Sequence, residues 1–179
     1  MAISLKGNNI KLRALEPEDL DLVFAIENDE SLWHLSTTLA PFSHHTIAEY
    51  LENAYRDIFE VKQLRLIIAS NESGIALGMI DLFDYEPKHR RAGVGILIFN
   101  ALHRGKGIAT EAIELLIRYS FSHLDMHQLY ANIIHDNLAS IKLFENAGFN
   151  KVGLKKDWLY IEGQYRDEYL YQLINTDVH

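Results

Sequence analysis

The chain has 179 residues, of which 48% are hydrophobic and 23% are charged, so its length and composition suit one globular domain spanning residues 1–179. It contains no cysteine, which excludes a disulfide framework, a thiolate metal site and a cysteine nucleophile. Its 25 acidic and 17 basic side chains give a formal net charge of −8. That charge argues against broad contact with nucleic-acid phosphates and permits a cationic small substrate, although ordinary solubility is the simpler explanation of it.

The first eleven residues contain no apolar stretch like that of a signal peptide, and no run approaches the roughly 20 apolar residues of a membrane span. Neither an internal repeat nor a low-complexity linker interrupts the chain. We therefore expect a soluble cytoplasmic protein that binds neither membrane nor nucleic acid. Formation of a homo-oligomer is left open.

The first half of the chain begins with Ile10, Leu12 and Ala14 alternating with polar residues, which predicts a strand. Pro17 among acidic neighbours then predicts the start of a helix that continues to about residue 28. Apolar residues at steps of three and four predict a second, amphipathic helix; they are Ile47, Tyr50, Leu51, Ala54, Tyr55 and Ile58. Three strands are predicted next, at residues 64–69, 75–83 and 94–99.

In the second half, a glycine-punctuated loop precedes a helix whose apolar face extends from Ile108 to Tyr119. The remaining predicted elements are a strand at 129–134, a helix at 138–146 ended by Gly148, and strands at 151–161 and 164–174 joined by a turn at Glu162-Gly163. This order predicts an α/β (α+β) fold with a mixed central sheet flanked by helices.

The loop Arg104–Thr110 has the chemistry of a phosphate or pyrophosphate site. Gly105 and Gly107 allow a sharp turn that directs several backbone N–H groups toward one point. The following helix adds unpaired N–H groups and the positive end of its dipole, and Arg104 and Lys106 add formal charge. A turn without a ligand is the alternative explanation of these glycines. A Walker-type loop is excluded, and so is the dinucleotide fingerprint, because position 110 is Thr where a third Gly would be needed.

Two blocks of residues resemble the GNAT superfamily of acetyl-CoA-dependent N-acetyltransferases. The family's pyrophosphate loop, Arg/Gln-x-x-Gly-x-Gly/Ala, is matched by Arg104, Gly107 and Ala109. About thirty residues further on, the family pattern Asn-x-x-Ala/Ser-Ile-x-Leu-Tyr-x-x-x-Gly-Phe is matched from Asn137 to Phe149, with Phe144 in place of Tyr. The two blocks occur in the right order and at the right spacing, so together they favour this family.

Further likeness, at residues 89–92 and 163–166, is similar to the branch that contains the spermidine/spermine acetyltransferases. Ribosomal-protein N-terminal acetyltransferases look similar as well. In all, the resemblance covers roughly residues 8–174. It implies a splayed central sheet of about six or seven strands, with the pantetheine arm of acetyl-CoA in a V-shaped opening between the strands at 94–99 and 129–134.

Unpaired backbone groups on two diverging strands could pair with the two amides of pantetheine, much as an added strand does. The cosubstrate contacts expected from loop chemistry and resemblance are Ile98, Arg104, Gly105, Lys106, Gly107, Ile108, Ala109, Thr110, Asn137, Ser140 and Phe144. A plain helix N-cap explains Asn137 equally well, and both roles are compatible.

Acetyl transfer to an amine needs a neutral nitrogen, a polarised thioester carbonyl and a protonated leaving thiolate. The family resemblance would supply a Glu base on the central strand and a Tyr acid in the second block. This chain has Gly93 just after Arg90-Arg91-Ala92, and Phe144 at the Tyr position. Both expected catalytic side chains are therefore missing.

Four residues are candidates to replace them. Asp81, Asp84 and Tyr85 lie on or just after the strand that precedes the central one, and His135 ends the other central strand. An imidazole titrates in the range useful for proton transfer. A turn cap is the alternative role for either Asp, and a solvated loop position is the alternative for His135.

The histidines do not suggest a metal site, because His123 and His127 lack the His-Glu-x-x-His pattern. For the acceptor, the resemblance suggests acidic residues of the N-terminal helical region, with Glu27 and Glu30 as candidate contacts and Trp33 as a pocket wall. Solvated helix faces explain the same acids.

The resemblance thus implies an acetyl-CoA-dependent N-acetyltransferase that acts on a primary amine, with a polyamine such as spermidine as the preferred acceptor. Acetylation of the N-terminus of a ribosomal protein is the alternative within the class. A CoA-binding regulatory module with impaired catalysis is the alternative of another class, and Gly93 and Phe144 are the residues that keep it open.

Overall fold

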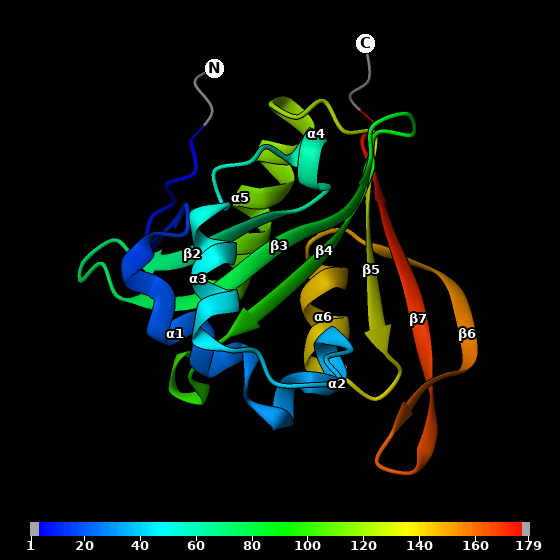
Figure 1. Ribbon diagram of the computed structural model, residues 1–179. Helices are drawn as coiled ribbons and strands as arrows, with labels where there is room; N and C mark the ends of the chain where they lie inside the picture. The colour runs from blue at the N-terminus through cyan, green and yellow to red at the C-terminus, as the bar shows by residue number, and fades with distance from the viewer. Residues whose placement is uncertain (1–3, 177–179) are drawn as a thin grey trace. The chain divides into compact units, whose positions relative to one another are not determined.

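The computed structural model describes residues 4–176 and shows two compact units. The larger unit consists of the chain up to Arg13 and from Asp57 onward, and the smaller unit is Ala14–Arg56. Figure 1 shows the elements of each. Within the described residues, no helix combines the length and apolar character needed to cross a membrane.

A seven-stranded mixed sheet is the frame of the larger unit (Figure 1). Its strand order is β1-β2-β3-β4-β5-β7-β6, and all neighbouring pairs are antiparallel except β4 and β5, which are parallel. The strands are β1 (Ile10–Arg13), β2 (Leu64–Ser70), β3 (Ala76–Glu86), β4 (Arg91–Ile98), β5 (Gln128–Ile134), β6 (Asn150–Ile161) and β7 (Gln164–Ile174). The predicted mixed sheet of about six or seven strands is confirmed.

One hydrophobic core joins this sheet to its helices, which are α4 (Ile58–Val61), α5 (Ile108–Ser122) and α6 (Leu138–Asn146). Helix α5 buries apolar residues at helical spacing, and α6 contributes Phe144. Strand residues enter the core alternately, as the two-residue period requires. The β4 and β5 members are Ala92, Val94, Ile98, Leu129, Ala131 and Ile133. Gly93, Tyr130 and Asn132 therefore belong to the opposite face of the sheet.

A polar clamp fixes one end of the β4–β5 pair. The Nε of Arg90 donates to the carbonyl oxygen of Asp125 at 2.7 Å, and its Nη2 lies 2.7 Å from the Asp125 carboxylate. The backbone N–H of His127 donates to the carbonyl of Arg90, also at 2.7 Å. These contacts bring the two strands together just before Arg91 pairs with Gln128.

The smaller unit is helical and contains η1 (Pro17–Asp19), α1 (Leu20–Glu27), η2 (Glu30–Leu32), α2 (Trp33–Ser36) and α3 (His44–Glu52). The rings of Phe24 on α1 and His44 on α3 stack with centroids 3.7 Å apart. Asn28 ties the two ends of the intervening loop together, because its amide donates to the carbonyl of Phe42 and its oxygen accepts the Phe42 N–H.

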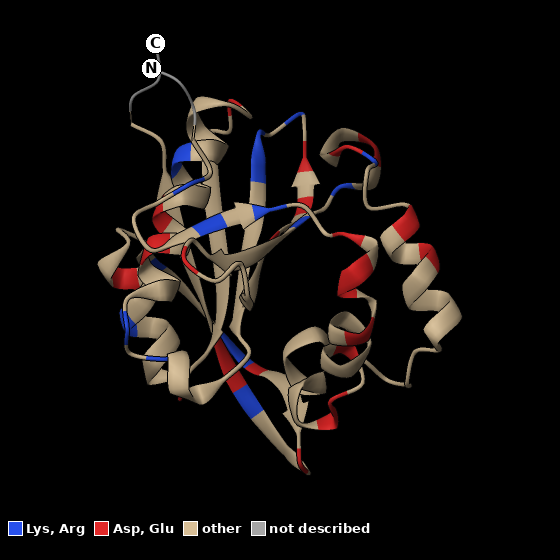
Figure 2. Cartoon of the chain, turned by 90° about the vertical axis from the view of Figure 1, so that its left-hand side faces the viewer, with Lys and Arg blue, Asp and Glu red and all other residues tan. Residues whose placement is uncertain are grey.

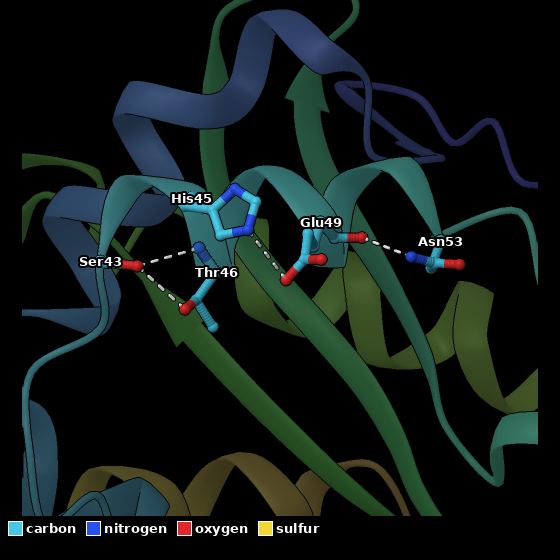
Figure 3. A network of polar contacts seen from close by, with 5 residues as sticks. All are labelled: Ser43, His45, Thr46, Glu49 and Asn53. Atoms are coloured by element: carbon cyan, nitrogen blue, oxygen red, sulfur yellow. Dashed lines mark hydrogen bonds and ion pairs between the residues drawn. The ribbon is translucent and has the colours of Figure 1, made fainter.

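Polar contacts along α3 define where this helix begins and ends (Figure 3). The hydroxyl of Ser43 caps the helix by accepting from the backbone N–H of Thr46 at 3.1 Å. One turn further along the helix, the Nε2 of His45 lies 3.6 Å from a carboxylate oxygen of Glu49. The side-chain amide of Asn53 donates to the backbone carbonyl of Glu49 at 2.7 Å.

The predicted helix at 47–58 is wrong in its C-terminal half. Helix α3 ends at Glu52, Tyr55 is 84% exposed, and Asp57 caps the separate short helix α4 by accepting from the N–H of Glu60. Apolar residues continue at helical spacing, but Asn53 and Asp57 bond to nearby backbone groups instead of extending the helix.

Candidate active site

The central feature of the larger unit is the divergence of β4 and β5, which Figure 1 shows clearly. The two strands pair only from Arg91 to Gly93 and from Gln128 to Tyr130. Beyond these residues β4 pairs with β3, and β5 pairs with β7. Within the described chain, the facing edges of 94–98 and 131–134 therefore have no strand partner, and their backbone groups are available to an extended ligand that carries amides.

The loop Arg104–Thr110 follows β4 and has the backbone of an anion cradle. Gly105 and Gly107 have φ values of 71° and 78°, and a Cβ added at either would meet nothing within 4 Å. Gly107 is the N-cap of α5 and supplies no side-chain cap, so the first-turn N–H groups of α5 remain available to an anion. Arg104 and Lys106 are exposed beside them. The space left free at both glycines fits a pyrophosphate that approaches the backbone closely.

Ile108, Ala109 and Thr110 form the half-buried first turn of α5, and Ile98 ends β4 with its side chain in the core. The structure thus gathers the predicted loop residues at one end of the opening. Only the backbone of Ile98 is suited to contact a ligand, as expected from the sequence.

A carboxylate in the first turn of α5 is already engaged by the chain itself. Glu111 accepts hydrogen bonds from the backbone and side-chain N–H groups of Asn9 at 3.0 and 3.1 Å. Burial acts to raise the pKa of Glu111, but the hydrogen bonds from the Asn9 region outweigh it and the pKa is lowered. Glu111 therefore stays ionised and ties the segment before β1 to α5.

The second predicted block forms α6. Asn137 is its N-cap, with its side-chain oxygen accepting the backbone N–H of Ser140 at 3.1 Å. The helix-cap role of Asn137 is confirmed, and its contact with the cosubstrate stays a prediction. Phe144 is only 3% exposed and meets Phe149 edge-on, with ring centroids 5.1 Å apart. Its ring packs in the core, and it has no hydroxyl to donate.

The place of the missing base is filled by another side chain. Phe83, Gly93 and Tyr130 lie side by side on β3, β4 and β5. A Cβ at Gly93 would lie 2.3 Å from the Phe83 ring, and that ring meets Tyr130 edge-on at a centroid distance of 5.9 Å. Gly93 therefore leaves no empty position for a carboxylate.

Sequence reasoning did not single out Phe83 or Tyr130. Burial raises the pKa of the Tyr130 phenol, and the charge of Asp84 raises it further, while Arg91 opposes this effect. The raised pKa keeps this phenol protonated near neutral pH. Tyr130 belongs to the last residue pair before the strands part, which places it beside the apex of the opening. The only sequence signal was the position of Tyr130 in the second strand of the predicted pair.

The four predicted replacement residues are dispersed. Both oxygens of Asp81 accept from Arg65 on β2, each at 2.8 Å, which favours a structural role. Asp84 lies exposed at a bulge with φ 48°, close enough to Tyr130 to affect its pKa. Tyr85 is 4% exposed and belongs to the core, where the half-exposed ring of Phe59 meets it edge-on, so the geometry favours packing over proton transfer.

The fourth candidate, His135, directly follows β5 and is half-buried. Its backbone N–H donates to the carbonyl of Asp167 at 3.0 Å, and its Nδ1 lies 3.3 Å from the same oxygen. This arrangement holds the imidazole against β7. No residue among 4–176 belongs to a cluster of three or more His, Asp or Glu suited to a metal ion.

The predicted acceptor contacts belong to the smaller unit. The indole N–H of Trp33 donates to the carbonyl of Glu27 at 2.9 Å, and Glu30 is exposed in the turn between them. Figure 2 shows acidic residues along the helices of this unit. Residues 14–56 contain nine acids and one base, whereas the rest of the sequence contains 16 of each. The net charge of −8 therefore resides in these 43 residues.

The mixed sheet thus opens between two parallel strands, and a loop with the chemistry of an anion site lies at the end of one of them. The family model of the acetyltransferase (GNAT) domain matches residues 9–150. The chain belongs to the GNAT family, and it is an acetyl-CoA-dependent N-acetyltransferase.

Individual relatives agree with this assignment. An uncharacterised N-acetyltransferase derived from the SPbeta prophage of Bacillus subtilis is 31% identical over 161 residues, which cover 90% of this chain and 87% of that protein. The spermidine N(1)-acetyltransferase of Escherichia coli is 28% identical over 164 residues, covering 90% of this chain and 83% of that protein. The crystal structure of the spermidine N-acetyltransferase from Vibrio cholerae, in complex with CoA and spermine, superposes with a TM-score of 0.81 at 25% identity, covering 92% of this chain and 95% of that one.

Proposed function

We propose that this enzyme acetylates a primary amine of a polyamine such as spermidine. The observation that carries the proposal is the concentration of the whole net negative charge in residues 14–56, in a chain whose relatives include spermidine acetyltransferases. Anionic surfaces raise the local concentration of a polycation and speed its encounter. Glu27 and Glu30 are the candidate contacts, with Trp33 as an aromatic wall.

Bound acetyl-CoA supplies the activated thioester whose acetyl group is transferred. The loop residues Arg104–Thr110 hold its pyrophosphate by backbone N–H groups and positive charge. The free edges of β4 and β5 align its pantetheine arm. Most of the acceleration then comes from holding the amine and the thioester together in a suitable geometry.

Position 93 provides no base, because Phe83 occupies the space, and Phe144 provides no acid. The acceptor amine must therefore lose its proton to water or to a group such as Asp84 or His135 before it attacks. The thiolate of CoA is a stable leaving group near neutral pH, so loss of the usual Tyr slows the reaction without abolishing it. The protonated phenol of Tyr130, beside the apex, is a candidate proton donor for this thiolate.

A substrate panel tests the proposal. Purified enzyme and acetyl-CoA are incubated with spermidine, spermine, and short peptides that have free Ala or Ser N-termini, and release of CoA is measured. Acetylation of the polyamines supports the proposal. Preference for the peptides would move the function to N-terminal acetylation of a protein. Tight acetyl-CoA binding without turnover of any amine would favour a regulatory module.

Ionic strength provides a second test. The KM for spermidine should rise between low and physiological salt, because screening weakens exposed attractions beyond about 8–10 Å. Lys substitutions at Glu27 and Glu30 should raise the KM similarly at low salt. Glu72→Lys, an equal change at an exposed acid of the charge-balanced larger unit, is the matched control and should have little effect.

The proposal also includes one catalytic domain that spans residues 1–179 and a cytoplasmic location, and it leaves self-association of the chain open. Cell fractionation tests the location, and light scattering of the purified protein tests the oligomeric state.

A further inference from the structure

The ammonium group of Lys155, on β6, lies among three groups that each recognise an alkylammonium ion. Its Nζ is 2.5 Å from the Glu168 carboxylate and donates to the side-chain oxygen of Asn132 at 3.0 Å. It also lies over the Trp158 ring, 4.9 Å from the centroid. A carboxylate, an amide oxygen and an indole face together form a complete cation-binding arrangement. We call Glu168, Asn132 and Trp158 the ammonium cage.

The fold builds this cage from three adjacent strands. Lys155 and Glu168 are direct partners on β6 and β7, and Glu168 pairs in turn with Ile134 on β5. Asn132 lies two residues before Ile134, on the same face of the sheet. The β6–β7 register breaks between Lys155 and Leu159, and this irregular segment includes Trp158. The cage therefore depends on strand register.

The cage opens toward solvent above a buried charge. The side chain of Glu168 is 10% exposed, and that of Lys155 is 27% exposed. A buried carboxylate needs a cation, because removal of its partner would leave an uncompensated charge. Replacement of the Lys155 ammonium by an ammonium ion from outside keeps the carboxylate paired, and a flexible lysine can move to water.

The cage also lies beside the opening between β4 and β5. Asn132 belongs to the part of β5 that has already left β4, and it shares a face with Tyr130 at the apex. Two residues along a strand span about 7 Å. A polyamine several carbons long therefore reaches from the apex region to the cage.

We propose that Glu168, Asn132 and Trp158 bind a second, non-reacting ammonium group of the acceptor, and that Lys155 occupies this subsite until the acceptor displaces it. The proposal rests on the polyamine function above and names a specificity subsite for it. The reacting nitrogen must be neutral, whereas a cage of this kind holds a charged nitrogen, so the two amines of one acceptor have different sites.

Steady-state kinetics of Lys155→Met with spermidine test the proposal. Loss of the internal competitor should lower the KM for spermidine about three- to tenfold. The KM for butylamine, which has no second ammonium group, should not change. Lys156→Met is the matched control, because Lys156 is the exposed neighbour on the same strand and the charge change is identical. Glu168→Gln should raise the KM for spermidine while leaving that for butylamine unaltered.

Because Lys155→Met leaves Glu168 without a cation, Lys155→Gln is tested beside it and keeps an N–H donor for the carboxylate. Thermal melts verify that both variants fold. The subsite is ruled out if both Lys155 variants have the same KM for spermidine as Lys156→Met. It is also ruled out if they change the KM values for spermidine and butylamine by the same factor. Failure of the wild-type enzyme to acetylate any amine would instead overturn the polyamine function, and the subsite with it.

Discussion

The loop Arg104–Thr110 and the apex row Phe83–Gly93–Tyr130 both depend on glycine, for opposite reasons. At Gly107 the backbone has a φ of 78° and the space around a side chain is open. At Gly93 the backbone is an ordinary strand, and the Phe83 ring fills the space. A missing side chain can thus leave space for a ligand or accommodate a neighbour, and only the structure distinguishes the two.

Gly107→Val should give the largest effect, a loss of acetyl-CoA affinity of about 100-fold, because one or two charge-assisted hydrogen bonds of about 1.5–3 kcal/mol each are blocked. Calorimetry with acetyl-CoA measures the loss. Gly74→Val is the control, since Gly74 has a similar φ of 73° and equally open space in the β2–β3 turn. Equal affinity in the two variants would remove the loop from the binding site.

Gly93→Ala should lower stability by about 1–3 kcal/mol, because its methyl group overpacks against Phe83. Gly95→Ala is the matched control two residues along β4, where the added Cβ would lie 3.8 Å from the same ring, an ordinary contact. Denaturant melts compare the two. The loss of stability in the double variant Phe83→Ala/Gly93→Ala should be smaller than the sum of the losses in the two single variants. Additive losses of stability would contradict the explanation that the added methyl group overpacks against the Phe83 ring.

Glu111→Gln should give the smallest effect, a loss of about 1 kcal/mol at pH 7, because the Asn9 hydrogen bonds lose a charged acceptor. The pKa of Glu111 is lowered in the folded state, so its contribution is present above the unfolded pKa and disappears as pH falls through the folded pKa. Melts from pH 7 to 3 should therefore show that the difference in stability between the wild type and the variant shrinks as the pH falls. A constant difference would mean that neutral hydrogen bonds or packing account for it.

The loop and its helix could be predicted from the sequence because their function depends on the backbone. Gly105, Gly107 and the first turn of α5 need only local conformation, which local sequence encodes. Helix α6 was predicted correctly at Leu138–Asn146 for the same reason, since Asn137 caps it and Gly148 follows it.

The apex row and the ammonium cage could not be predicted, because both depend on strand register. Phe83 faces Gly93 only in the observed β3–β4 register, which a bulge breaks before Glu86. Trp158 lies in the register break of β6 next to Lys155. The period-two pattern assigns a residue to a face, but it does not identify the residue beside it on the next strand.

The uneven distribution of acids also affects folding. The nine acids within residues 14–56 repel one another with a single base to offset them, and such repulsion opposes compaction of that segment. Added salt or a bound polycation weakens the repulsion, so the helical unit should become more stable as the concentration of either rises. A multivalent cation would then act on this segment as a condition for its order, independently of any part it has in the reaction.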